Sequence, residues 1–222
     1  MEVKRSGRRG RPPQTAEDVE RVRESIVAAT AKVFAAHGSR NLSVALVIEQ
    51  AGIARPTFYR YFANVEEPLA VLLERSDAAL GDGIAKAAAA ATDAVGLAVS
   101  VIDAYLQWAA DRGPALRPLF RECYDPASPV STHREIALSG IRELLNAKMV
   151  EFGRAAPEPL ELDTLLSGCE FLGFRVSLAE GEDRADITDR ARFIMVRMAV
   201  ATLGRPEDLL RVLSMPGAYD QF

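Results

Sequence analysis

The sequence is poor in the side chains that build metal centres and disulfide-stapled folds. Its 222 residues include two cysteines, Cys123 and Cys169, and two histidines, His37 and His133. Two cysteines are too few for a disulfide-stapled scaffold. With two histidines and no Cys-x-x-Cys pair, no metal or other cofactor is expected. The longest stretch without a charge, 94–102, has nine residues, whereas a membrane-spanning helix needs roughly 17–25. No apolar segment of a secretory signal follows the basic N-terminus, so we expect a cytoplasmic protein with no membrane partner.

Sequence signatures of catalysis are also missing. There is no Gly-x-Ser-x-Gly and no phosphate-binding loop with Gly-Lys, and Gly81-Asp82-Gly83 lacks the third glycine of a dinucleotide fingerprint. His133, Glu135 and Cys123 could be drawn as a site, but nothing in the sequence fixes their geometry. We therefore predict that the protein is not an enzyme.

Charge is distributed unevenly along the chain. The formal net charge is -4, but residues 1–64 carry +5 and residues 65–222 carry -9. A basic N-terminal part on an acidic body is the asymmetry expected when one small domain binds a polyanion. Chance clustering of charge is the alternative.

The hydrophobic periodicity is helical throughout. Apolar residues recur every three or four positions, and no run alternates in the manner of a strand. We predict an all-α fold with a disordered basic arm at 1–15, a domain at 16–64 and a larger domain at 65–222. The expected helices are 16–37, a short one after Ser43 that ends at Ala51-Gly52, a short one from about Ala54 to Phe62, one from Asn64 to about Asp82, and then 93–112, 115–124, 130–154, 160–180 and 188–203.

The two short helices have the spacing of a helix-turn-helix. Ala51-Gly52-Ile53 joins them, and the glycine permits the sharp turn. The residues that suit the interior are Leu46, Ile53 and Phe58. The residues left to face outward are Arg55, Thr57, Tyr59, Arg60 and Tyr61. Hydroxyl and guanidinium groups on an exposed second helix suit phosphate binding and base reading, although the two tyrosines could instead pack on neighbouring helices.

A specific motif covers the same region. A helix ending in Phe34-Ala35-Ala36-His37-Gly38 is followed by Leu42-Ser43-Val44, by 48–53, and by Pro56-Thr57-Phe58-Tyr59-Arg60-Tyr61-Phe62. From Val22 to Leu73 the chain resembles the DNA-binding domain of the TetR family of bacterial transcriptional repressors. The resemblance implies a homodimer of all-helical subunits. Each subunit has an N-terminal three-helix DNA-binding domain and a larger C-terminal ligand-binding and dimerisation domain.

The resemblance also implies which residues contact double-stranded DNA. Ser43 and Val44 open the first short helix near the backbone, Arg55, Pro56 and Thr57 face bases or adjacent phosphates, and Tyr59 and Tyr61 bind phosphates. Arg60 and Asn64 complete the expected interface. The sequence departs from the family at three positions: Ala54 replaces a capping Ser or Thr, Val65 replaces a Lys that contacts phosphate, and Ile48 replaces an Ala.

The basic arm adds a second DNA-binding element. Arg9-Gly10-Arg11-Pro12 resembles the core of an AT-hook, in which Arg9 and Arg11 would enter a narrow A·T-rich minor groove. A plain electrostatic tail is the alternative. In either case the arm should raise affinity and steepen its salt dependence.

The acidic body offers a dimer interface and a ligand pocket. Helices 160–180 and 188–203 are apolar nearly all round, so a partner subunit is expected to cover them, as in the family; a thick monomer core is the alternative. Aromatic residues of the middle helices could line a cavity for a small, hydrophobic or amphipathic effector, or could simply be core. The pocket residues we expect are Tyr105, Trp108, Phe120, Tyr124, Met149, Phe152, Phe171 and Arg175. Arg175 could alternatively pair with Glu170 or Asp103.

These expectations combine into a repressor that a small ligand releases. The helix from Asn64 would carry a shift from the cavity to the DNA-reading domains, whose separation must match a palindromic operator. Two rivals remain: an architectural A·T-rich DNA binder that uses the arm without a ligand, and a helical enzyme with an accidental helix-turn-helix.

Overall fold

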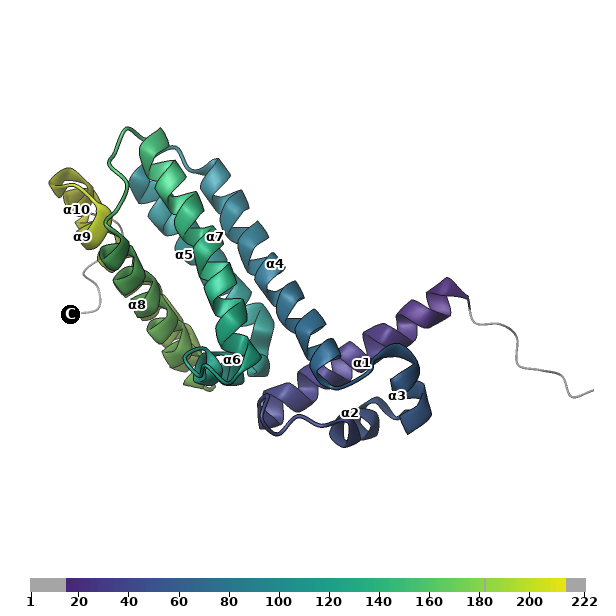
Figure 1. Cartoon of the computed structure of the whole chain (residues 1–222). Coiled ribbons are helices and arrows are strands. Elements are labelled where there is room, and N and C mark those ends of the chain that lie inside the picture. The colour runs from purple at the N-terminus through teal and green to yellow at the C-terminus, as the bar shows by residue number, and fades with distance from the viewer. Residues whose placement is uncertain (1–14, 182, 215–222) are drawn as a thin grey trace, which may run out of the picture.

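The computed structural model describes residues 15–181 and 183–214, and the described residues are helical with no strand among them (Figure 1). This confirms the all-α class. The elements are α1 (Ala16–His37), α2 (Val44–Ala51), α3 (Arg55–Tyr61), α4 (Glu66–Ala90), α5 (Ala94–Arg112), the short 3-10 turn η1 (Gly113–Ala115), α6 (Leu116–Glu122), α7 (Pro129–Glu151), α8 (Pro159–Leu178), α9 (Asp183–Leu203) and α10 (Pro206–Leu213).

Local sequence signals set several helix ends. Thr15 and Asp18 form a capping box at the start of α1, because each side chain accepts a hydrogen bond from the backbone N–H of the other. Asp93 caps α5 by accepting a hydrogen bond from the Gly96 N–H at 2.8 Å. Gly52 ends α2 in the left-handed region at φ 64°, a conformation that glycine adopts without steric cost.

The helices divide between a small head and a longer body (Figure 1). The head consists of α1, α2, α3 and the first turns of α4, around fully buried Ile26, Phe34, Val47 and Phe58. The body is a bundle of α4, α5, α7, α8 and α9 with two further hydrophobic cores. Helix α4 runs from the head into the bundle, and α6 lies where the bundle meets α1.

Helix α4 is longer than predicted. It continues through Gly81 and Gly83 to Ala90 instead of ending near Asp82. Each interior glycine costs about 1 kcal/mol relative to alanine. The buried residues beyond them, Ile84 and Ala88, gain more than this by packing against α5 and α7.

Two C-terminal features also differ from the prediction. Helix α9 begins at Asp183, ahead of the expected residue 188, and α10 was not predicted at all. Helix α10 is eight residues long, and a tertiary contact holds it: the Arg154 guanidinium binds the Asp208 carboxylate at 2.6 and 3.0 Å. This ion pair lowers the pKa of the Asp208 carboxyl.

Within the described ranges, no helix combines the length and the apolar character needed to cross a bilayer.

We predict that Gly52→Ala destabilises the protein by about 1–2 kcal/mol, the cost of placing a side chain in the left-handed region. No atom lies within 4 Å of the position a Cβ would take at Gly52, so the effect is conformational rather than steric. Gly140→Ala, on an exposed part of α7 with equally open surroundings, should instead stabilise by about 1 kcal/mol. Urea unfolding of both variants tests this, and a shift of the same sign in both would contradict it.

Candidate DNA-binding interface and ligand cavity

The turn between α2 and α3 is fixed by backbone hydrogen bonds and by one aromatic ring. Ser43 caps α2 by accepting a hydrogen bond from the Leu46 N–H at 3.3 Å. After Gly52, the Ile53 N–H donates back to the Ile48 carbonyl at 3.1 Å. Phe58 is completely buried and anchors α3 on the head core. Ala54 makes no side-chain cap at the start of α3, as the sequence predicted.

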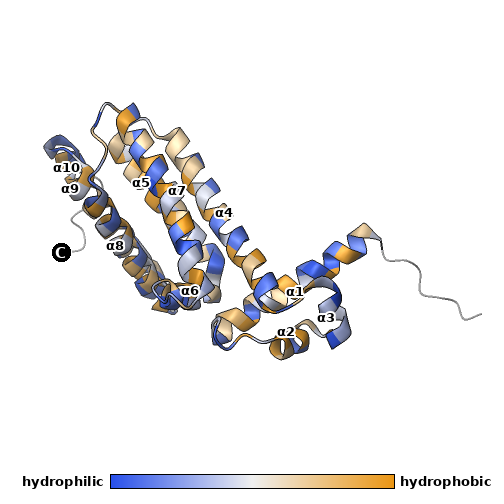
Figure 2. Ribbon diagram, viewed as in Figure 1, coloured by the Kyte–Doolittle hydropathy of each residue, from blue (hydrophilic) through white to orange (hydrophobic). Residues whose placement is uncertain are grey.

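The outer face of α3 presents polar and aromatic groups to solvent. Arg55, Pro56, Tyr59 and Arg60 are exposed, and 47% of the Tyr59 surface is accessible. The Arg55 guanidinium donates a hydrogen bond to the Tyr59 hydroxyl at 3.2 Å. Figure 2 shows the contrast with α2, which is mainly orange, whereas α3 is pale to blue. The pair therefore offers a cation and a hydroxyl on the solvent side of a short helix.

Four other predicted interface residues are less exposed than these. Ser43, Val44, Thr57 and Tyr61 are half-buried, and Val44 and Tyr61 pack against the head core. The expectation that Tyr61 simply faces outward is therefore wrong, because its ring is partly used in packing. The Arg23 guanidinium of α1 donates to the Tyr61 carbonyl at 3.1 Å and fixes the end of α3.

The segment between α3 and α4 is a helix cap. The side-chain oxygen of Asn64 accepts a hydrogen bond from the Glu67 N–H at 3.0 Å, and the Glu67 carboxylate accepts one from the Ala63 N–H at 2.8 Å. Asn64 is exposed and caps α4, as predicted. Arg9 and Arg11 lie outside the described residues.

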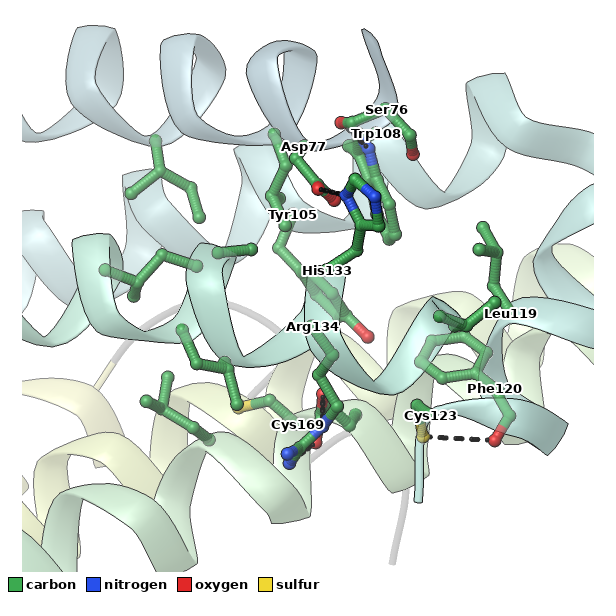
Figure 3. A pocket seen from close by; sticks show the side chains of 18 of the residues that line it. Ser76, Asp77, Tyr105, Trp108, Leu119, Phe120, Cys123, His133, Arg134 and Cys169 are labelled. Atoms are coloured by element: carbon green, nitrogen blue, oxygen red, sulfur yellow. Dashed lines mark hydrogen bonds and ion pairs between the residues drawn. The ribbon is translucent and has the colours of Figure 1, made fainter. Parts of the chain in front are cut away.

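A largely apolar cavity of about 130 Å³ lies in the body between α4, α5, α6, α7 and α8. Tyr105 and Trp108 of α5 line it with their rings stacked at a centroid distance of 5.9 Å, and Phe120 of α6 closes one end (Figure 3). The Trp108 indole N–H donates to the Ser76 carbonyl at 3.0 Å, so the ring is fixed on α4. The volume is close to that of an engineered cavity of about 150 Å³ that binds benzene.

Two polar pairs, made by consecutive residues of α7, border this cavity. His133 Nδ1 lies 2.7 Å from Asp77 Oδ2 on α4 (Figure 3). The Arg134 guanidinium binds the Glu170 carboxylate of α8 through two hydrogen bonds of 2.7 and 2.6 Å. Burial raises the pKa of the Asp77 carboxyl, and the hydrogen bond with His133 partly opposes this. The pairs connect α7 to both neighbouring helices and give each buried carboxylate a hydrogen-bond partner.

The two thiols that line the first cavity are unreactive at neutral pH. Burial raises the pKa of Cys123 to about 11 and that of Cys169 to about 12. Both thiols therefore remain protonated near neutral pH, and a protonated thiol is neither a nucleophile nor a metal ligand. Among the described residues, no group of three or more His, Cys, Asp or Glu side chains is placed to hold a metal ion.

A carboxylate at the end of α6 joins the body to the head. Glu122 accepts hydrogen bonds from the Ser39 N–H at 2.9 Å, from the Ser39 hydroxyl, and from the Ser128 hydroxyl at 2.7 Å. It packs so closely on Gly38 that a Cβ there would meet its Oε1 at 2.5 Å. Beside it, Arg40 and Asp125 form an ion pair. The loop that precedes α2 is thus held by the helix that supplies Leu119, Phe120 and Cys123 to the cavity.

Comparison with known proteins identifies the head. The sequence model for bacterial regulatory proteins of the tetR family matches residues 26–67, which include all of α2 and α3. Residues 26–67 therefore form a DNA-binding domain of the TetR family, and the helix-turn-helix of α2 and α3 lies within it. The comparison with curated proteins found no match.

Solved structures share the fold over most of the chain. A TetR-family transcriptional regulator from Pectobacterium atrosepticum aligns with a TM-score of 0.59 and 22% identity, covering 87% of this chain and all (100%) of that one. The fatty acid degradation regulator FadR from Bacillus halodurans aligns with a TM-score of 0.62 and 19% identity, covering 79% of this chain and 94% of that one. SmeT, the repressor of the Stenotrophomonas maltophilia multidrug efflux pump SmeDEF, aligns with a TM-score of 0.64 and 16% identity. The alignment covers 84% of this chain and 92% of that one. At these identities the similarity shows the fold alone.

The structure brings together some of the predicted pocket residues. Tyr105, Trp108 and Phe120 line the cavity. Met149 lines a second, smaller cavity instead. Phe152 is half-buried and packs against a core of the body without reaching the first cavity. Helical periodicity places such residues in the interior but does not tell a cavity wall from filled core.

Three predicted pocket residues face solvent. The exposed fractions are 64% for Tyr124 and 61% for Phe171, and Arg175 is also exposed. The Tyr124 hydroxyl donates to Glu170 at 3.0 Å from outside the cavity. The suggested partners of Arg175 are already paired: Glu170 with Arg134, and Asp103 with Arg192.

The polar residues of the cavity were missed in the sequence. On α4, Ser76 and Asp77 interrupt the apolar stripe between Leu73 and Leu80, and on α7, His133 and Arg134 interrupt one in the same way. Polar groups inside an apolar stripe must be paired or face a cavity. This interruption of the apolar stripe is the sequence signal from which the polar cavity residues could have been predicted.

We predict that Glu122→Ala lowers the free energy of unfolding by about 2–3 kcal/mol, because three half-buried donors lose a charged acceptor. The matched control is Glu143→Ala, which removes an exposed carboxylate on α7 and should change stability by less than about 0.5 kcal/mol. Chemical denaturation measures both. Equal effects of the two substitutions would show that the contact between α6 and the head contributes no stability.

Proposed function

We propose that this TetR-family chain is a homodimeric transcriptional repressor that binds a palindromic operator through α3 and is released by a small, largely apolar ligand in the body cavity. The observation that carries the proposal is that α3 is polar and exposed while α4 both lines the body cavity and packs in the head core. Leu73 of α4 belongs to the head core and also lines the cavity. Ligand and DNA would thus act on one structural element.

The DNA-contact roles follow from exposure and chemistry. Arg55, Pro56 and Thr57 form the first turn of α3, the part of a recognition helix that approaches base edges in the major groove. The exposed Tyr59 hydroxyl suits a phosphate oxygen, with Arg55 beside it. Ser43, Val44, Arg60, Tyr61 and Asn64 would contact the flanking backbone, and Arg9 and Arg11 would reach the minor groove.

The proposed dimer rests on the apolar surface of α8 and α9. Phe171, Leu178 and Ile194 are large hydrophobic residues with exposed fractions of 61%, 46% and 42%. Soluble monomers rarely leave large apolar patches uncovered. A symmetric pairing of these two helices would cover them and give the twofold symmetry of a palindrome.

Two structural connections would carry the ligand signal. The first is α4, which supplies Asp77 and Leu80 to the cavity and Leu69 to the head core. The second is α6, whose Phe120 lines the cavity and whose Glu122 holds Ser39. A ligand that displaces either helix would change the separation of the two α3 helices. It would weaken operator binding while each head stays folded.

Selection from a pool of random DNA duplexes tests the proposed function. The protein is used at two salt concentrations, with residues 1–15 present or deleted. A palindromic site that survives arm deletion is expected. Recovery only of A·T-rich sequences, lost with the arm, would favour the architectural alternative. No recovery under any condition would contradict a DNA-binding role and favour the enzyme alternative.

We predict different effects of two substitutions on α3. Tyr59→Ala should weaken binding to every duplex by about 1 kcal/mol, roughly fivefold, through loss of a phosphate hydrogen bond. Thr57→Ala should instead change which operator is preferred. Fluorescence anisotropy with the selected operator and single-base variants measures both. Uniform weakening of all duplexes by Thr57→Ala would contradict its assignment as a base-reading residue.

A further inference from the structure

A second cavity lies next to the first, toward the start of α5 and the ends of α7 and α9. Its volume is about 80 Å³, and it lies between α5, α8, α9 and the end of α7. Ala98, Leu145, Leu165, Ala199 and Leu203 are among the residues that line it. Neither the proposed DNA interface nor the proposed dimer surface uses this space.

One layer of side chains separates the two cavities. Val101 and Ile102 of α5, with Leu166 and Cys169 of α8, line both of them. Val101 and Leu166 are half-buried, and a ligand that reaches both cavities would need a rotamer change at one of them. Along α5 the combined lining runs from Ala94 to Trp108. This is roughly 21 Å at 1.5 Å per residue, longer than the roughly 15 Å of hydrocarbon in one bilayer leaflet.

The two ends differ in what they offer a ligand. Among the described residues that line the second cavity, the one charged group is Asp208. Its carboxylate is already bound by Arg154 at 2.6 Å and by the Arg205 N–H at 2.7 Å. This end therefore has apolar walls and no available charge for a polar head. It suits the tail of an amphiphile.

The first cavity is the polar end, but its carboxylates already have hydrogen-bond partners. Asp77 pairs with His133, and Glu170 pairs with Arg134. A carboxylate or ammonium group entering here would meet side chains that are already paired and would lose its hydration. An uncharged hydroxyl or carbonyl group loses much less on entry. It can also exchange hydrogen bonds with the paired side chains.

We propose that one single-chain amphiphile with an uncharged polar head occupies both cavities. Its head lies near His133 and Arg134, and its unbranched hydrocarbon tail passes Val101 and Leu166 into the second cavity. The inference rests on the proposed function for the role of the ligand as effector, but the site itself is defined by the cavities alone.

A series of linear alcohols from butan-1-ol to dodecan-1-ol tests the site, with the alkanoates of equal length as charged counterparts. Trp108 is the one tryptophan of the sequence and lines the first cavity. Its fluorescence and titration calorimetry therefore report binding. Affinity should rise by up to about fourfold per added methylene group until the tail fills the second cavity. Each alkanoate should bind less tightly than the alcohol of the same length.

Ala98→Leu fills the second cavity without touching the first, and Ala110→Leu is the matched control on an exposed part of α5. In Ala98→Leu the gain with chain length should stop several carbons earlier, while short alcohols bind as in the wild type. Thermal unfolding checks that each variant is folded. If Ala98→Leu is not, Ala98→Val fills less of the same cavity and should shift the limit by less.

An identical length limit in the wild type and in folded Ala98 variants would overturn the tail assignment. Alkanoates that bind as tightly as the alcohols would overturn the uncharged head. Failure of the proposed function looks different: alcohols would bind with the expected length dependence but leave affinity for the selected operator unchanged. Conversely, operator binding with no affinity for any alcohol would contradict the amphiphile site but not the proposed DNA-binding function.

Discussion

Helix α4 belongs to the hydrophobic cores of the head and of the body at once. Leu69 and Leu73 pack with Phe34 and Phe58 in the head, whereas Ile84 and Ala88 pack in the bundle. Because packed interiors resist compression, a shift at one end of such a helix cannot be absorbed locally. The position of α3 relative to the body therefore depends on how the bundle packs around α4. Under the proposed function, a small molecule in the cavity beside α4 would change that position.

Two polar pairs connect the helices that form the walls of the first cavity. His133 and Arg134 connect α7 to Asp77 of α4 and to Glu170 of α8. Replacing one partner would leave a buried charge unpaired, so the pairs fix the wall geometry. The cost is a less complete apolar core in the middle of the body. Under the proposed function, this lower stability is the consequence of keeping space for a ligand.

The head was largely predictable from sequence, and the cavity was not. The cap at Ser43, the turn at Gly52 and the inward Phe58 are local signals, and the structure confirms them. The walls of a cavity depend on how distant helices pack, which periodicity does not encode. Tyr124 therefore entered the predicted pocket although it is exposed, and α10 was missed because the Arg154–Asp208 ion pair holds it.

The most direct test of this coupling is the operator affinity of a variant with a filled cavity. Ala137 lines the first cavity on α7, whereas Ala147 lies at an exposed position of the same helix and lines neither cavity. Ala137→Leu should imitate a ligand and weaken binding to the selected operator by roughly 5–150-fold, the usual range of coupling between sites. Ala147→Leu should leave it unchanged. Equal, wild-type affinity of both folded, dimeric variants would contradict control of DNA binding by the cavity.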